Sequence, residues 1–192
     1  MVVVDTVYKG IERVLAQHAP ERGGALYGTR GYPLVTHFEY DPDAETSAAS
    51  YVPSARLVGS VQRIEAQTGL EFKGIIHSHP RGLLLPSRQD EWAVSRFFEL
   101  NPHYACMALP IVQQVTASLT AEGGGTPFLH WYRAERARKH AARRIGVTAS
   151  GDRAASVPTV SVVAEEFHVL PLQNHVEQIA ALLTRSTGAQ IS

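Results

Sequence analysis

The stretch from residue 72 to residue 90 constrains the fold most, because it orders a strand, a loop and a helix around unusual side chains. An apolar run over residues 72–79 predicts a strand that ends in two histidines, His77 and His79. Side chains two residues apart on a strand project from the same face, so both imidazoles can reach one metal ion at about 2.0 to 2.1 Å. A helix is predicted over residues 87–100, after a loop with prolines near both ends. Such a loop can fold back and bring Asp90, early in that helix, beside the histidines as a third ligand.

The composition leaves histidine and carboxylate as the ligand types for such a site. The chain has nine histidines but one cysteine, Cys106, which excludes an intrachain disulfide framework and a cysteine-rich zinc knuckle. Two histidines and one aspartate leave a fourth coordination position open to water, as catalytic zinc sites do. Hydrolysis also needs a proton acceptor, and Glu21, Glu39 and Glu71 are the carboxylates considered for it. Glu21 is favoured, because it precedes a pair of glycines at the start of a strand, where small residues allow close approach.

Short helices and strands account for most of the remaining chain up to Trp131. Apolar residues at helical spacing predict a helix that follows Asp5 and stops before Pro20, and another over residues 53–68 that ends at Gly69. Strands are predicted over residues 23–29, 34–40, 104–109, 115–119 and 128–132. The first two of these strands should form a hairpin, and residues 41–50 a polar loop. Cys106 is expected to pack inside its strand as a small hydrophobic side chain.

The composition changes after Trp131. Basic residues are frequent in a helix-compatible stretch over residues 133–144, and small polar residues follow as far as residue 156. We therefore predict a domain over residues 1–134 and a basic helix with a polar linker over residues 135–158. A C-terminal extension over residues 159–192 is predicted to hold one strand and one helix.

The residues around the predicted metal site resemble the signature of the JAMM (JAB/MPN) metalloprotease family. The signature reads His77-x-His79-Pro80 followed by Ser87-x-x-Asp90, with Glu21-x-Gly-Gly upstream. The resemblance extends over residues 1–134, and compact bacterial and archaeal members are most similar in length and in the Glu-x-Gly-Gly opening.

This resemblance implies an α+β fold, in which a curved mixed β-sheet with flanking helices forms a three-layer arrangement like that of cytidine deaminases and carries a C-terminal appendage. It implies one zinc ion per chain bound by His77, His79 and Asp90, with Glu21 as general base for the zinc-bound water and Ser87 stabilising the oxyanion. The implied activity is an isopeptidase or peptidase that cleaves after the C-terminus of ubiquitin or a ubiquitin-like protein. The open tetrahedral pattern and the resemblance favour zinc over iron, cobalt or manganese.

Other interpretations of the same residues stay open. Ser87 and Asp90 also have the spacing of a capping box, which is compatible with a metal role for Asp90. Relatives that have lost ligands bind ubiquitin-like proteins without cleaving them, so a non-cleaving binding module is a second hypothesis. A bacterial family associated with DNA repair shares the histidine and Ser-x-x-Asp pattern, and the basic stretch over residues 133–144 gives this third hypothesis some support.

Charge and hydropathy limit the partners that the chain is expected to have. The formal net charge is +0 and the isoelectric point about 7.1, so no overall field directs the protein to nucleic acid or to an anionic membrane. The sequence lacks a signal-peptide pattern and a run of eighteen apolar residues. We therefore expect a soluble cytoplasmic protein whose partners are ubiquitin-like proteins and their conjugates, with no membrane partner. Nucleic acid is not favoured as a partner and would have to bind a local patch.

Overall fold

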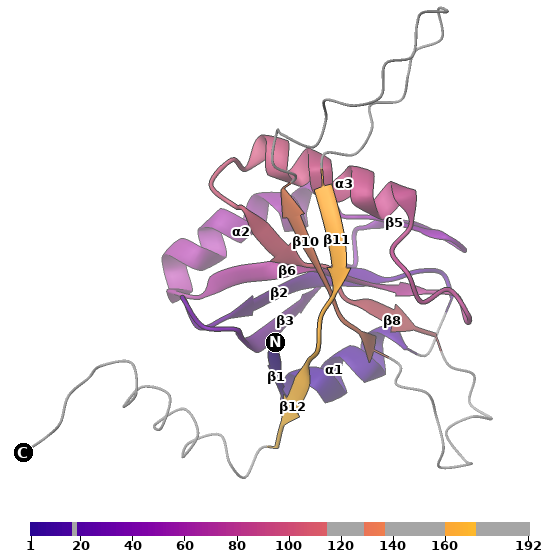
Figure 1. Cartoon of the computed structure of the whole chain (residues 1–192), viewed down its shortest axis with the longest axis horizontal. Helices are drawn as coiled ribbons and strands as arrows, with labels where there is room; N and C mark the ends of the chain where they lie inside the picture. Colours follow the sequence, from indigo (N-terminus) through magenta and orange to yellow (C-terminus); the bar gives the residue numbers. More distant parts are fainter. Residues whose placement is uncertain (17–18, 115–128, 137–159, 172–192) are drawn as a thin grey trace, which may run out of the picture.

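The computed structural model describes residues 1–16, 19–114, 129–136 and 160–171 (Figure 1). Its helices are α1 (Asp5–Leu15), α2 (Ala55–Thr68) and α3 (Arg88–Leu100). Its strands are β1 (Val2–Val4), β2 (Gly23–Gly28), β3 (Leu34–Tyr40), β4 (Glu45–Ser47), β5 (Ser50–Val52), β6 (Glu71–His79), β7 (Cys106–Ala108), β8 (Ile111–Gln113), β9 (Leu129–His130), β10 (Tyr132–Arg136), β11 (Val160–Ala164) and β12 (His168–Leu170). Among these helices, none is both long and apolar enough to cross a bilayer.

Most of the described strands form one mixed sheet. The order is β11-β10-β7-β6-β2-β3-β1-β12. Beside this path, β8 pairs with the last residues of β6, and β9 pairs with β8. The central pairs β2–β3 and β2–β6 are antiparallel, whereas β6 pairs with β7 and β8 in parallel. The strand β6, which ends in the two histidines, therefore lies inside the sheet with a neighbouring strand on each side. These neighbours fix the positions of its backbone and side chains.

Hydrophobic side chains alternate between the two faces of this sheet, and helices cover both faces. On one face α1 packs its buried residues Val7, Ile11 and Leu15 against Leu26 and Ile76. On the other face α2 and α3 pack against the side chains that alternate with these along the strands. That second core includes Tyr27, Tyr51, Leu57, Val61, Ile75, Val94, Phe98 and Ile111. The predicted α+β fold, with a mixed sheet between flanking helices, is confirmed (Figure 1).

The helix ends follow the capping residues in the sequence. Ser54 caps α2 by accepting a hydrogen bond from the backbone amide of Leu57, and Gly69 ends the helix with a φ of 71°. Ser87 and Asp90 form a complete capping box at α3, as their spacing predicts. The first helix ends at Leu15, somewhat before the predicted stop at Pro20.

Three predictions for the middle of the chain were wrong in detail. The stretch over residues 41–50, predicted as a polar loop, contains β4, which pairs with β5 in a short hairpin. The residues of β4 are polar and exposed, so they show no alternation of apolar and polar residues from which a strand could be predicted. The strand predicted over residues 104–109 is confined to β7, and Cys106 at its start is exposed instead of packed inside. The strand predicted over residues 128–132 is divided at Trp131 into β9 and β10, which pair with different strands.

The C-terminal part of the chain contributes strands to the same sheet. Residue 134 lies within β10, and β10 pairs with β11 at five positions, while β12 pairs in parallel with β1. The strand predicted after residue 159 is confirmed as β11. Residues 133–136 are strand and not helix, because β7 and β11 flank them on both sides. The rest of the predicted basic helix and linker, the strand over residues 115–119 and the helix of the extension lie outside the described residues.

Candidate metal centre

Four buried polar side chains come together where β6 ends and α3 begins. The Nε2 atoms of His77 and His79 are 2.9 Å apart, and Asp90 places Oδ1 3.1 Å from the first and Oδ2 3.4 Å from the second. Glu21, just before β2, joins the two histidines so that one ligand atom from each of the three lies within 4.8 Å of the others. Each of the four residues is at most 8% exposed. The structure thus brings the predicted ligands and the predicted base to one point.

The arrangement of these atoms fits a bound metal ion. Ligand atoms at about 2.0 to 2.1 Å from a tetrahedral ion are roughly 3.3 Å apart, close to the 2.9, 3.1 and 3.4 Å separations of the histidine nitrogens and the Asp90 oxygens. Two imidazole nitrogens that face each other in a buried site repel through their lone pairs unless a proton or a cation lies between them. Glu21, His77 and His79 could therefore hold a metal ion, with Asp90 in contact with both histidines.

Main-chain pairing fixes Glu21 beside the histidine strand. In the sheet Gly23 is paired with His77. The amide of Arg22 donates to the Ser78 hydroxyl over 2.9 Å, and the amide of Ser78 donates to the Arg22 carbonyl over 2.7 Å. The amide of Glu21 itself donates to the carbonyl of Ser47 in β4. Glu21 is therefore held from two sides, although it lies outside any regular element.

Two carbonyl groups of the loop between β6 and α3 hold it in place, one against His79 and the next against Tyr132 in β10. Nδ1 of His79 lies 3.2 Å from the carbonyl oxygen of Leu83, a contact that suits an Nδ1–H donor and leaves Nε2 free as a ligand. The next carbonyl, of Leu84, accepts a hydrogen bond from the Tyr132 hydroxyl over 2.9 Å. Sequence reasoning missed Tyr132 and Ser78, since neither carries a local pattern that refers to the metal site.

Asp90 serves the helix and the histidines at once. Its Oδ2 accepts a hydrogen bond from the Ser87 amide over 2.6 Å, and the Ser87 hydroxyl accepts one from the Asp90 amide over 3.2 Å. Ser87 itself is exposed at the start of α3. The capping box therefore sets the direction in which the Asp90 carboxylate meets His77 and His79.

The two carboxylates of the site differ in their protonation. Burial raises the pKa of Glu21 to about 7, although the nearby His79 acts in the opposite direction. Burial also acts to raise the pKa of Asp90, but hydrogen bonds with His77 and His79 outweigh it and hold that pKa well below its usual range. Burial opposes the charged form of His79, yet the hydrogen bond with Asp90 and the charges of Asp90 and Glu21 raise its pKa. Asp90 is thus suited to permanent negative charge, and Glu21 to accepting and releasing a proton.

The two alternative carboxylates have other contacts. Glu71 pairs with Lys73 over 2.6 Å and accepts a hydrogen bond from the Gly31 amide. Glu39 accepts hydrogen bonds from Tyr27 and Ser60. Neither of them belongs to the buried group around the histidines.

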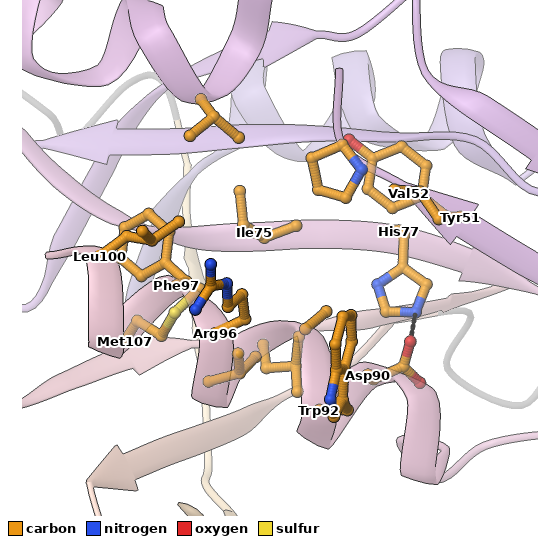
Figure 2. A pocket seen from close by; sticks show the side chains of 15 residues that line it. Tyr51, Val52, Ile75, His77, Asp90, Trp92, Arg96, Phe97, Leu100 and Met107 are labelled. Atoms are coloured by element: carbon orange, nitrogen blue, oxygen red, sulfur yellow. Dashed lines mark ion pairs between the residues drawn. The ribbon is translucent and has the colours of Figure 1, made fainter. Parts of the chain in front are cut away.

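An apolar cavity of about 190 Å³ adjoins the metal centre (Figure 2). His77 and Asp90 form part of its wall, and apolar side chains from β5, α2, β6, α3 and β7 form most of the rest. Three of its lining residues, Val52, Trp92 and Leu100, are exposed by 43, 56 and 60% at the surface. The cavity therefore connects His77 and Asp90 to an accessible apolar rim.

Comparison with known proteins gives matches in a family model and in solved structures. A family model described as prokaryotic homologs of the JAB domain matches residues 5–116. A solution structure of a protein from Desulfitobacterium hafniense is similar in fold, with a TM-score of 0.59 and 15% identity over 91% of this chain and 97% of that one. A crystal structure of a JAB1/MPN domain protein from Archaeoglobus fulgidus aligns with a TM-score of 0.39 and 16% identity over 68% of this chain and 87% of that one. No curated protein matches the chain.

Proposed function

Since the match over residues 5–116 spans more than half of its length, the chain belongs to the prokaryotic family of JAB-domain proteins, and we propose that it is a zinc-dependent peptidase or isopeptidase of the JAMM type. Its substrate class is the peptide or isopeptide bond that follows the C-terminus of ubiquitin or a ubiquitin-like protein. The observation that carries the proposal is the buried meeting of two histidines and two carboxylates beside an open apolar cavity. A site built only for stability would not need a carboxylate with a pKa near neutrality.

In this proposal His77, His79 and Asp90 hold one zinc ion per chain, and Glu21 is the general base. When bound, zinc would polarise the scissile carbonyl and lower the pKa of a coordinated water. Glu21 takes a proton from the attacking water and passes it to the leaving amine, a task for which its raised pKa is matched. Asp90 stays ionised and keeps both histidines oriented.

Ser87 has a proposed second task besides capping α3. Its hydroxyl accepts a hydrogen bond from the Asp90 amide and still has its own proton to donate. We propose that this proton stabilises the oxyanion that forms on the substrate carbonyl. Its exposure at the start of α3 leaves the hydroxyl accessible to a substrate.

The apolar cavity supports a peptide chain as the substrate. A cavity of about 190 Å³ exceeds one of about 150 Å³ that binds benzene, so it accommodates one leucine or phenylalanine side chain. Its wall includes His77 and Asp90, so a side chain bound there belongs to a residue close to the scissile bond. We propose that the substrate tail places one apolar side chain in this cavity.

Zinc analysis combined with a substrate screen tests this function. We expect near one zinc per purified chain and little in a His77→Ala, His79→Ala double variant, followed by cleavage of at least one conjugate or precursor in a panel of ubiquitin-like proteins. A zinc-bearing protein that binds such a conjugate without cleaving it would favour the non-cleaving module. Equal zinc in parent and double variant would contradict the metal centre itself.

A further inference from the structure

The two histidines of the metal centre differ in what fixes their rings. Nδ1 of His79 has the Leu83 carbonyl as a partner at 3.2 Å. Nδ1 of His77 is buried and has no hydrogen-bond partner in the described part of the chain. Metal-bound histidines almost always have such a partner, because it sets the tautomer and the orientation of the ring. His77 therefore needs another means of orientation.

The ring of Tyr51 in β5 supplies a contact of the right kind. It lies nearly parallel to the His77 ring, with an interplanar angle of 11° and 5.6 Å between the ring centroids. Figure 2 shows the two rings next to each other, with His77 directed to Asp90. Tyr51 is 5% exposed, so its ring has little freedom to leave this position. A ring stacked on an imidazole restricts its rotation without needing a hydrogen-bond acceptor.

Tyr51 is itself held by two contacts near its hydroxyl group. Its hydroxyl donates a long hydrogen bond of 3.4 Å to the buried carboxylate of Asp41, which also accepts bonds from the Ser54 amide and hydroxyl at the start of α2. The hydroxyl-bearing edge of the ring also packs closely over Gly23, the strand partner of His77. A Cβ at position 23 would lie 2.5 Å from Cζ of Tyr51 and 2.6 Å from the Ile76 carbonyl oxygen, so only glycine leaves room for the ring.

We propose that Tyr51 is the positioning residue of His77, and that the hairpin of β4 and β5 is thereby a structural part of the metal centre. The inference rests on the proposed metal site and extends it to a residue outside the family signature. Tyr51 acts through His77 and has no role in the reaction itself. Its loss should weaken metal binding and alter the ligand geometry.

Two buried tyrosines give a matched pair of variants for the test. Tyr27 belongs to the same core, is 1% exposed and donates its hydroxyl to Glu39, but within the described residues its ring packs on Phe72 and not on His77 or His79. Tyr51→Leu and Tyr27→Leu therefore remove similar side chains, and Tyr51→Phe keeps the stacked ring. Zinc affinity is measured by chelator competition, thermal stability without metal, and the visible spectrum with cobalt(II) in place of zinc.

We expect Tyr51→Leu to bind zinc about 10- to 100-fold more weakly than the parent, as for other residues that orient a ligand, and to change the cobalt spectrum. Tyr51→Phe should restore both, and Tyr27→Leu should keep the parent's affinity and spectrum despite a lower melting temperature. A folded Tyr51→Leu protein with the parent's zinc affinity would overturn the inference, and so would equal weakening by Tyr27→Leu. Weak binding in Tyr51→Leu, when no conjugate is cleaved by the parent, would refute the proposed activity and leave the role of Tyr51 intact.

A measurement on the metal-free parent covers the case in which Tyr51→Leu does not fold. The ring protons of His77, assigned by a His77→Gln variant, should show nuclear Overhauser contacts with the ring protons of Tyr51. The contacts should persist in Tyr51→Phe. Assigned His77 resonances without these contacts would overturn the inference without any variant of Tyr51.

Discussion

Glu21 and Asp90 are both buried acidic residues of one site, yet their environments suit them to different tasks. Hydrogen bonds from two histidines keep Asp90 ionised, whereas burial brings the pKa of Glu21 to about 7. Pairs of carboxylates whose pKa values are driven apart in this way usually divide ligand or electrostatic work from proton transfer. The separation can be tested, because the two tasks respond differently to removal of a charge.

Replacement of Glu21 by glutamine should lower turnover by about 10²-fold or more, in line with general-base contributions, while the zinc content stays at the parent's value. The amide keeps the size of the side chain but cannot accept the proton. Rates are measured on the conjugate that the parent cleaves best, and zinc on the same preparations. Glu12→Gln, on the exposed side of α1, serves as the control. Full activity in Glu21→Gln would assign the base to another group.

The sequence predicts the residues of the metal centre better than it predicts the residues that position them. His77, His79 and Asp90 carry a local spacing, and Glu21 precedes a recognisable glycine pair. Tyr51 has no such signal, because its strand is three residues long and begins at the end of the stretch predicted as a polar loop. The contact of Tyr51 with His77 depends on how segments distant in sequence pack together. Such packing cannot be predicted from a local sequence pattern.

Helix α3 links secondary structure to chemistry through its first turn. The serine that caps the helix is the same residue that is proposed to donate to the oxyanion. Removal of the Ser87 side chain would therefore change stability and activity together. Substitutions that keep one property and remove the other can separate them.

Ser87→Asn should separate capping from catalysis. Asparagine caps helices about as well as serine, so the free energy of unfolding should stay within about 0.5 kcal/mol of the parent, whereas Ser87→Ala should lose about 1 kcal/mol. Both variants lack the hydroxyl, and both should lose roughly 10²-fold in turnover, as expected for one oxyanion donor. Urea unfolding and initial rates measure the two properties. Parent-like turnover in Ser87→Asn would restrict Ser87 to capping.

The second turn of α3 provides a test of the apolar cavity. Ala93 lines this cavity, so Ala93→Phe should fill it and raise KM about 10-fold, the equivalent of losing one buried aliphatic side chain at roughly 1.5 kcal/mol. The value of kcat and the zinc content should not change, because the substrate and the transition state lose the same binding energy. Ala66→Phe on the exposed side of α2 is the matched control. An unchanged KM in Ala93→Phe would place the substrate elsewhere.

At the scale of the whole molecule, two strands from the C-terminal part of the described chain, β11 and β12, lie at opposite ends of the main strand order. The strand β12 pairs with β1, and β11 pairs with β10, from which it is separated in sequence by residues 137–159. Composition alone suggests a division near residue 134, because basic and small polar residues begin there. Pairing partners so far apart in sequence cannot be derived from local patterns, although the strand character of β11 can.

The strand β11 offers adjacent positions on opposite faces to test how far it supports the fold. Val162 packs against the core beneath α2 and α3, whereas Val163 is 42% exposed and lies opposite Arg133. Val162→Asp should lower the free energy of unfolding by about 2 kcal/mol, since it places an unpaired charge at a partly buried position against the core, and Val163→Asp should change it by less than about 0.5 kcal/mol. Urea unfolding should show one cooperative transition that shifts as a whole in Val162→Asp. A separate early transition, with the main midpoint unmoved, would instead make β11 part of an independent appendage.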